Sequence, residues 1–142
     1  MNIFLRIISK ILIIVFFSNS ALCSELDFEK ILTNNFKLIT KSSSKTVEPV
    51  IEKLLNSNFS KVEEFLKFWK SKKLIFTKKT KVIAILKQKN KLGYELIQFS
   101  NNRNLGFFKK KEFKIIKPNS GVRSKISNAL IGFQLQSKDA NT

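Results

Sequence analysis

The stretch KLIFTKKTKVIAILKQ, residues 73–88, decides the fold class because the spacing of apolar residues changes there. Its two apolar runs are rich in β-branched and aromatic residues, and Val82, Ala84 and Leu86 recur at every second position. That period is typical of β-strands, and the lysines and Thr80 between the runs suit a tight connection. Because the flanking segments have helical period, we expect an α+β fold.

Further strands are predicted downstream of this stretch. Gly93 suits a turn with a positive φ before YELIQF, and SNNRN is a second polar turn. LGFF and FKII are short apolar runs on either side of a lysine cluster. Residues 74–116 are therefore expected to form a small antiparallel β-meander that Pro118 ends.

Three short amphipathic helices are predicted before the strands. The first covers residues 26–39, TKSSSKT then forms a loop, and Thr46 can cap a second helix with Pro49 in its first turn. SKVE, residues 60–63, has the pattern of a capping box for a third helix that ends near Lys70. Their apolar faces are Phe28, Leu32, Phe36 and Ile39, then Val47, Val50, Ile51, Leu54 and Leu55, then Val62, Phe65, Leu66 and Trp69.

After Pro118 the sequence returns to a helical period. Asn119 or Ser120 can cap this last helix, which we expect to cover one side of the meander. An uncovered part of its apolar face would be a candidate docking surface, whereas plain core packing is the alternative interpretation. Residues 138–142 are expected to be an unstructured tail. The candidate docking face consists of Val122, Ile126, Ala129, Leu130 and Phe133.

Residues 1–23 have the layout of a secretory signal peptide. Basic residues precede an apolar run, and small and polar residues follow it. Ala21 and Cys23 would occupy the −3 and −1 positions of the cleavage site. We therefore expect a periplasmic or other extracytoplasmic, secreted protein with a cleaved signal peptide.

Two other interpretations of this N-terminus are weaker. An uncleaved membrane anchor needs about 20 apolar residues, and Arg6 and Lys10 interrupt the stretch. A lipoprotein signal built on Cys23 would need a small residue where Leu22 stands. Cleavage removes the only cysteine, so no disulfide can form and the stability of the mature chain depends on packing.

The mature chain is expected to fold as one compact domain over residues 24–137. Residues 24–70 form its helical segment, and residues 71–137 form the meander and the closing helix. A length of 142 residues with 43% hydrophobic residues is sufficient for one small core.

The residue types present exclude several kinds of active site. The chain has no histidine, and Cys23 belongs to the signal peptide, which excludes His-based triads, thiol nucleophiles and the usual zinc sites. Glu63 and Glu64 are interpreted as a capping residue and its solvated neighbour. No Gly-rich phosphate loop is present. We therefore expect no enzymatic activity, no cofactor and no metal site.

The net charge of +17 has two interpretations. It indicates an anionic partner, or it reflects solubility together with a codon bias toward A and T, which enriches lysine. GFFKKKEFK, residues 106–114, interleaves aromatic residues with lysines, which suits either an anion-binding surface or ordinary strand alternation. Since only three basic residues are arginine, base readout is disfavoured and no nucleic-acid partner is expected. The candidate anionic-partner patch is Lys109, Lys110, Lys111 and Lys114.

Two segments carry a resemblance to a known family. SKKLIFTKKTKVIAI, residues 71–85, and NSGVRSKISNALIGFQLQSKD, residues 119–139, resemble the N-terminal extracytoplasmic region of urea-type ABC transporter permeases, in the branched-chain amino-acid permease group. The residues that match in character are Leu74, Phe76, Lys78, Val82 and Ile83 in the first segment and Asn119, Val122, Arg123, Ile126, Ala129, Leu130, Leu135, Ser137 and Asp139 in the second.

The resemblance implies an accessory region without the membrane domain that transports the solute. We therefore expect a non-catalytic extracytoplasmic module that docks on a transporter permease, its solute-binding protein or an anionic membrane surface. No substrate-binding residue carries over from the family. The alternatives are a free-standing basic periplasmic module that binds anionic surface polymers or lipid, and a truncated gene product without separate activity.

Overall fold

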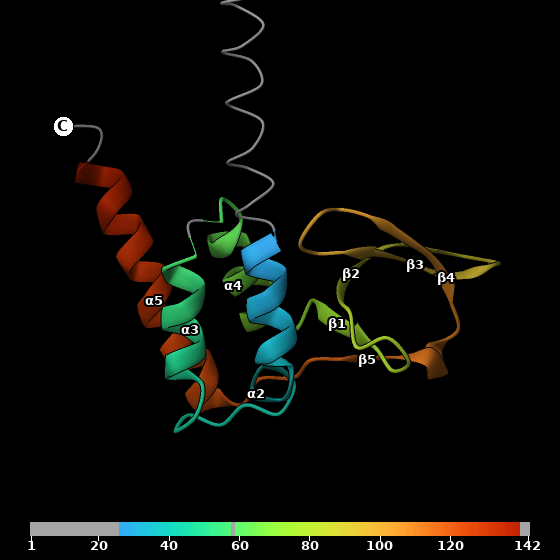
Figure 1. Ribbon diagram of the computed structural model, residues 1–142, viewed down its shortest axis with the longest axis horizontal. Helices are drawn as coiled ribbons and strands as arrows, with labels where there is room; N and C mark the ends of the chain where they lie inside the picture. The colour runs from blue at the N-terminus through green and yellow to red at the C-terminus, as the bar shows by residue number, and fades with distance from the viewer. Residues whose placement is uncertain (1–25, 58, 140–142) are drawn as a thin grey trace, which may run out of the picture.

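The computed structural model describes residues 26–57 and 59–139. The expected signal peptide, with Ala21 and Cys23, lies outside the described residues. The predicted α+β fold is confirmed: helices and a five-stranded antiparallel sheet lie side by side (Figure 1). The elements are a helix at residues 26–34, α2 (Phe36–Thr40), α3 (Glu48–Leu55), α4 (Val62–Lys70), β1 (Leu74–Thr77), β2 (Ile83–Asn90), β3 (Gly93–Gln98), β4 (Asn104–Phe108), the 3-10 turn η1 (Lys110–Glu112), β5 (Phe113–Ile115) and α5 (Ser120–Asp139).

The helical part has an aromatic core at its centre. Phe28 of the first helix stacks on Phe59, with ring centroids 4.1 Å apart, and meets Phe65 of α4 edge to face at 5.5 Å. The predicted inward face of α4 is confirmed, because Val62, Phe65, Leu66 and Trp69 are all buried. The single helix expected at residues 26–39 is divided at Asn35, which forms a turn and whose side-chain amide donates to the Ile31 carbonyl at 2.8 Å.

Both predicted helix caps in this part are wrong by one residue. The N-cap of α3 is Val47 rather than Thr46, and that of α4 is Lys61 rather than Ser60; neither makes a side-chain capping bond. Local turns account for the difference. The Thr46 hydroxyl accepts from the Ser43 N–H at 3.2 Å, and a turn from Phe59 leads into α4.

Four strands form the predicted meander, but the fifth does not extend it. The strand order is β4-β3-β2-β1-β5, so β5 pairs with β1 at the opposite edge from β4. Ile75 is therefore the register partner of both Ala84 and Ile115. The φ of Gly93 is 132°, and a Cβ there would lie 2.7 Å from the Phe108 carbonyl oxygen, which explains why glycine is required at this turn.

The sheet curls around a second, smaller core. Tyr94 of β3 and Phe113 of β5 meet edge to face at 5.2 Å, although two strands separate them in the sheet order. Ile75, Ala84 and Leu96 are buried in the same cluster. Residues from distant strands thus share one apolar interior.

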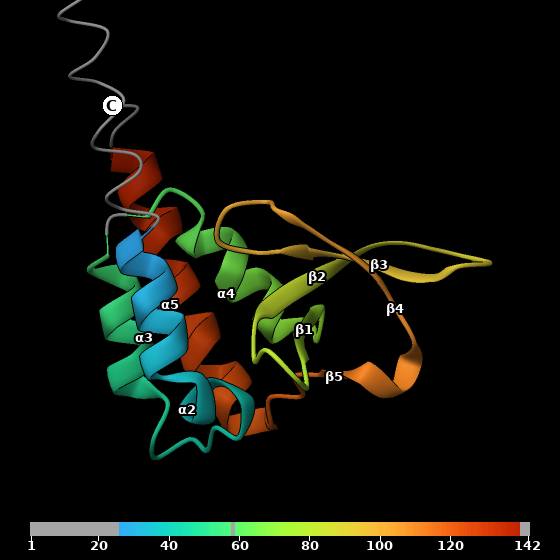
Figure 2. The same ribbon diagram turned by 45° about the vertical axis from the view of Figure 1, so that its right-hand side comes forward.

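Helix α5 packs on other helices instead of the meander. The Asn119 side chain accepts from the Val122 N–H at 2.9 Å, which confirms the predicted cap. The helix then runs along α4 and α3, and α4 lies between it and the strands (Figures 1 and 2). Our expectation that α5 covers the sheet was wrong, because the apolar faces of α3 and α4 offer it a continuous surface. Its backbone stays helical to Asp139, inside the expected tail.

The start of α5 passes close to the loop before α3. A Cβ added to Gly121 would lie 2.7 Å from the Cβ of Ser44, so only glycine allows this approach. Lys125, one turn later, lies 3.1 Å from a carboxylate oxygen of Glu48. Within the described residues, no helix is long and apolar enough to cross a membrane.

Candidate functional site

A hollow of about 490 Å³ lies between α2 and one end of the sheet and is rich in lysine. We call it the lysine hollow. Five lysines from three separate segments line it, together with two aromatic residues and one threonine. Its lining residues are Phe36, Lys37, Thr40, Lys41, Phe76, Lys78, Lys81 and Lys114.

Aromatic packing brings the three segments together. Phe36 of α2 meets Phe76 of β1 edge to face at 5.2 Å, which fixes the short helix against the sheet. Lys37 lies in α2, and Lys41, four residues later, is the residue at which this short helix ends. Lys114 is the register partner of Phe76, so it lies beside this aromatic pair.

The β1–β2 turn supplies the other two cations. The Lys78 N–H donates to the Glu112 carbonyl at 2.8 Å, and the Lys81 N–H donates to the Thr77 carbonyl at 3.0 Å. The φ of Lys81 is 58°, in the left-handed region that disfavours a residue with a side chain. The turn thus holds both lysines at the hollow in a fixed backbone conformation.

Within the described residues, the five ammonium groups are not neutralised by carboxylates. No carboxylate lines the hollow, and in the part of the chain that the structure describes none of the five lysines forms an ion pair. Like charges repel at short distance, and an anion in the hollow would relieve that repulsion. The site therefore has the chemistry to bind phosphate or carboxylate groups.

The patch predicted at Lys109, Lys110, Lys111 and Lys114 is not a single cluster. Lys114 lies in the lysine hollow beside Phe76, whereas Lys110 lies over the rings of Tyr94 and Phe113, at 5.5 and 5.0 Å. Lys114 lines a concavity with Phe76, and Lys110 lines another with Ile75. Since Ile75 and Phe76 are neighbours on β1 and point to opposite faces of the sheet, the two lysines lie on opposite faces as well. Lys109 and Lys111 are exposed on and beside η1.

The predicted docking face on α5 is largely occupied. Val122 and Ile126 are completely buried in the helical core, so they cannot contact another protein in the folded chain. Ala129, Leu130 and Phe133 are half-buried and pack against the same core. The exposed apolar residues of this helix are instead Ile131 and Leu135.

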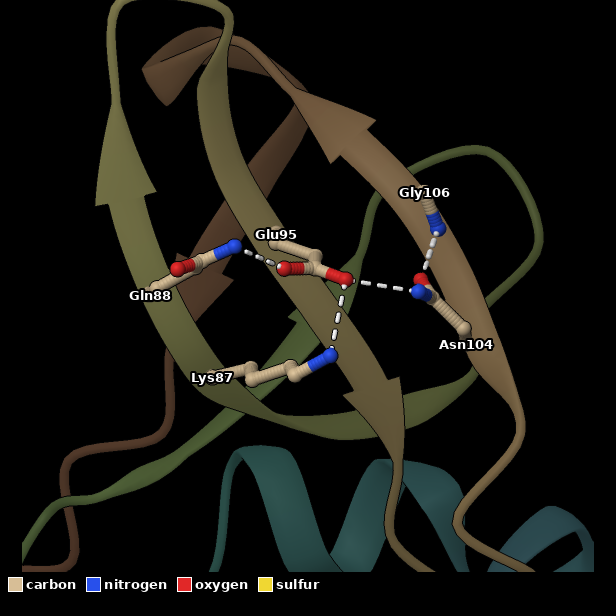
Figure 3. Close-up of polar contacts among 5 residues, drawn as sticks. All are labelled: Lys87, Gln88, Glu95, Asn104 and Gly106. Carbon is tan, nitrogen blue, oxygen red and sulfur yellow. Dashed lines mark hydrogen bonds and ion pairs between the residues drawn. The ribbon is translucent and has the colours of Figure 1, made fainter.

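The most elaborate polar cluster surrounds Glu95 on β3 (Figure 3). Glu95 is 5% exposed, and its carboxylate accepts from Lys87 at 3.2 Å, from Gln88 at 2.5 Å and from Asn104 at 2.6 Å. Asn104 in turn accepts from the Gly106 N–H at 2.8 Å. The cluster therefore ties β2, β3 and β4 together.

Burial raises the pKa of Glu95, but the hydrogen bonds from Lys87, Gln88 and Asn104, together with the Lys87 charge, outweigh burial and leave the pKa below its usual value. A carboxylate that stays ionised and is fully hydrogen-bonded is a poor general acid and a weak base. The cluster is better suited to holding the sheet than to catalysis.

A second polar cluster joins the first helix to the sheet. Glu29 accepts hydrogen bonds from Ser100 and from Gln98, the latter at 2.8 Å. Ser100 is 2% exposed, so a substrate could not reach its hydroxyl. Among the described residues, no three His, Cys, Asp or Glu side chains gather in a way that could hold a metal ion.

Comparisons with known proteins leave the family open. No family model matches the chain, and no curated protein or solved structure is significantly similar to it. The resemblance to urea-type permease regions therefore stays a prediction.

Four of the five lysines in the hollow were not predicted as site residues from the sequence. The pattern around Lys37 predicted a helix that ends before a loop at Lys41, and the pattern around Lys78 and Lys81 predicted a turn. Neither pattern indicates that the two segments meet. Only Lys114 belonged to the predicted patch.

Proposed function

We propose that this protein is a non-catalytic, extracytoplasmic module that binds an anionic surface polymer in the lysine hollow. The observation that supports this proposal is the convergence of five lysines, from α2, the β1–β2 turn and β5, on a concavity with no lining carboxylate. The extracytoplasmic location is part of the proposal and is supported by the signal-peptide layout of residues 1–23.

Lysine determines what kind of anion suits the hollow. An ammonium group is a compact charge on a flexible stem, without the fixed fork of arginine, so it recognises charge density rather than one planar geometry. Five such groups in one hollow suit a chain with closely spaced phosphates or carboxylates. Phe36 and Phe76 add apolar surface for the backbone of that polymer.

The test compares two variants with the same change in charge. K41Q/K78Q/K114Q removes one lysine from each segment of the hollow, whereas K45Q/K53Q/K91Q removes three exposed lysines elsewhere. Polyphosphate and a polyuronate serve as probes in isothermal titration calorimetry, at about 0.05 to 0.5 M NaCl, over which charge screening changes strongly.

The hollow variant should bind the better of the two polymers about tenfold more weakly than the control, since three contacts of roughly 0.5 kcal/mol each are lost. The preferred polymer tells whether phosphate or carboxylate is the natural group. Equal losses in the two variants would show that binding depends only on total charge and would refute the hollow as a site.

A second candidate function is docking on a transporter permease or its solute-binding protein. The exposed apolar residues Ile131 and Leu135 of α5 favour it, because they lie outside the helical core. I131D/L135D should abolish co-purification with a co-expressed urea-type permease complex and leave polymer binding unchanged. Co-purification that survives this double substitution would exclude α5 as the contact.

A further inference from the structure

We propose that a second site, on the other face of the sheet, binds a single-chain anionic amphiphile such as a fatty-acid carboxylate or an alkyl phosphate. This apolar groove has a volume of about 450 Å³, within the range of ligand pockets in proteins. Its walls include Ile75 and Phe113 from the curled sheet and Phe68 from α4.

The inside of the groove is suited to a hydrocarbon chain. Seven of its ten lining residues are apolar or aromatic. Leu86 is 47% exposed at its edge, and Ile115 is also exposed, so apolar surface faces the solvent where a ligand would cover it. Burying such surface is favourable, and a linear acyl chain can do so without leaving polar groups unpaired.

The rim of the groove selects the charge of the ligand. The other three lining residues are Lys72, Lys73 and Lys110, and no carboxylate is among the lining residues. Lys73 lies 5.7 Å from the ring centroid of Phe68, and Lys110 lies 5.0 Å from that of Phe113, so both ammonium groups stand over the aromatic walls. A cationic amphiphile would be repelled, and an anionic head group would be attracted.

The end of α4 brings two of these lysines to the rim. The Lys73 N–H donates to the Phe68 carbonyl at 2.9 Å, and the Lys72 N–H donates to the Trp69 carbonyl at 3.1 Å, a helix-ending turn. The φ of Lys72 is 60°, at a position where glycine is usual. The chain thus carries a charged side chain at a strained position beside the groove.

This site is distinct from the lysine hollow. The two concavities share no lining residue, and they use Ile75 and Phe76, neighbours that point to opposite faces of β1. The amphiphile proposal therefore does not depend on the polymer proposal, and K41Q/K78Q/K114Q should leave amphiphile binding unchanged.

The first experiment uses protein purified from cells that express the full chain, and titrates it with carboxylates of eight to twelve carbons below their micelle concentrations. Affinity should rise with chain length, up to about fourfold for each added methylene, because each buries further apolar surface. Alkyl trimethylammonium of equal length should bind at least about tenfold more weakly, because its head group meets three lysines. Alkyl phosphates of the same length distinguish the two head groups. Affinity that is independent of chain length, or equal for cationic and anionic heads, would refute the proposal.

Matched variants locate the binding. L86E places a carboxylate at the edge of the groove and should reduce affinity at least about tenfold by repelling the head group and the chain. L92E changes an equally apolar residue that is 74% exposed in the β2–β3 turn, outside the groove, and should bind like the parent. Equal binding by L86E and L92E, with both folded by circular dichroism, would overturn the assignment.

Two further measurements keep the proposal testable if L86E does not fold. Methyl NMR of the parent should show ligand-induced shifts at Ile75 and Ile115, and shifts confined to other methyl groups would contradict the site. K110Q, which removes the positive charge, should weaken carboxylate binding. K110R, which keeps the charge, should bind carboxylate like the parent. Binding only to anionic vesicles, without binding of monomeric carboxylate, would refute a single-chain ligand and indicate a membrane-surface contact.

Discussion

Tyr94 and Phe113 meet edge to face, with ring centroids 5.2 Å apart, across the interior of a sheet in which their strands are not neighbours. This contact connects β3 to β5 and keeps the sheet curled. The small core, the apolar groove and the position of η1 all depend on that curvature.

Phe113→Ala should lower the free energy of unfolding by about 3 kcal/mol or more, because it leaves a cavity where a buried ring closes the sheet. Phe107→Ala, at an exposed aromatic residue of β4, should cost less than about 1 kcal/mol. Urea denaturation followed by circular dichroism measures both. Similar costs for the two variants would show that the ring contact does not stabilise the curled sheet.

Glu95 should make the fold sensitive to acid. Its pKa is lower in the folded chain than in the unfolded chain, so its stabilising contribution is complete above the usual glutamate pKa of about 4.3 and is lost as the pH falls through the lower folded value. Glu95→Gln should be destabilising at pH 7, because an amide nitrogen then faces donors from Lys87, Gln88 or Asn104.

The difference in unfolding free energy between the parent and Glu95→Gln should therefore shrink as the pH falls below about 4. Urea melts from pH 7 to pH 3 test this expectation, with Glu52→Gln, at an exposed residue of α3, as the control. A difference that stays constant over this range would mean that Glu95 has the same pKa in both states.

Lys72→Gly should stabilise the fold by about 1 kcal/mol, because glycine adopts a positive φ without the steric cost of a side chain. Lys53→Gly, inside α3, should instead cost about 1 kcal/mol through lower helix propensity. Thermal unfolding of both variants provides the measurement. A loss of stability in Lys72→Gly would indicate that the Lys72 side chain contributes more to packing than its backbone conformation costs.

Two glycines of α5 should respond in opposite ways to alanine. Gly132 has open space where a Cβ would be built, so Gly132→Ala should add roughly 0.5 to 1 kcal/mol of stability. Gly121→Ala should be destabilising, because its Cβ would clash with Ser44 and displace the start of the helix. Ser44→Gly in the Gly121→Ala background should recover part of the loss. If it recovers nothing, the contact with Ser44 is not the cause.

The parts of the fold that depend on periodicity could be predicted from the sequence. The inward face of α4 followed from a helical spacing, and the turn at Gly93 followed from its conformational freedom. The helix caps were wrong because Thr46 and Ser60 have suitable side chains, but neighbouring backbone turns shift each helix start by one residue. Periodicity shows which face a residue occupies, but it does not show which local turn forms.

The pairing of distant elements could not be predicted in the same way. Nothing in the short run FKII indicates that β5 returns to β1 instead of continuing next to β4. The same limitation applies to the lysine hollow, because Lys41, Lys78 and Lys114 meet only after α2, the β1–β2 turn and β5 are in place. A candidate site built from several segments requires the tertiary structure.

The position of α5 in the chain has a consequence for the order of folding. Val122 and Ile126 complete the core of helices that are synthesised long before them, and β5 completes the sheet by pairing with β1. Contacts between residues far apart in sequence slow folding, and the unfinished core exposes apolar surface in the meantime. A chain released before residue 120 should therefore be prone to aggregation and chaperone capture, and cooperative folding should begin only when the last helix has emerged.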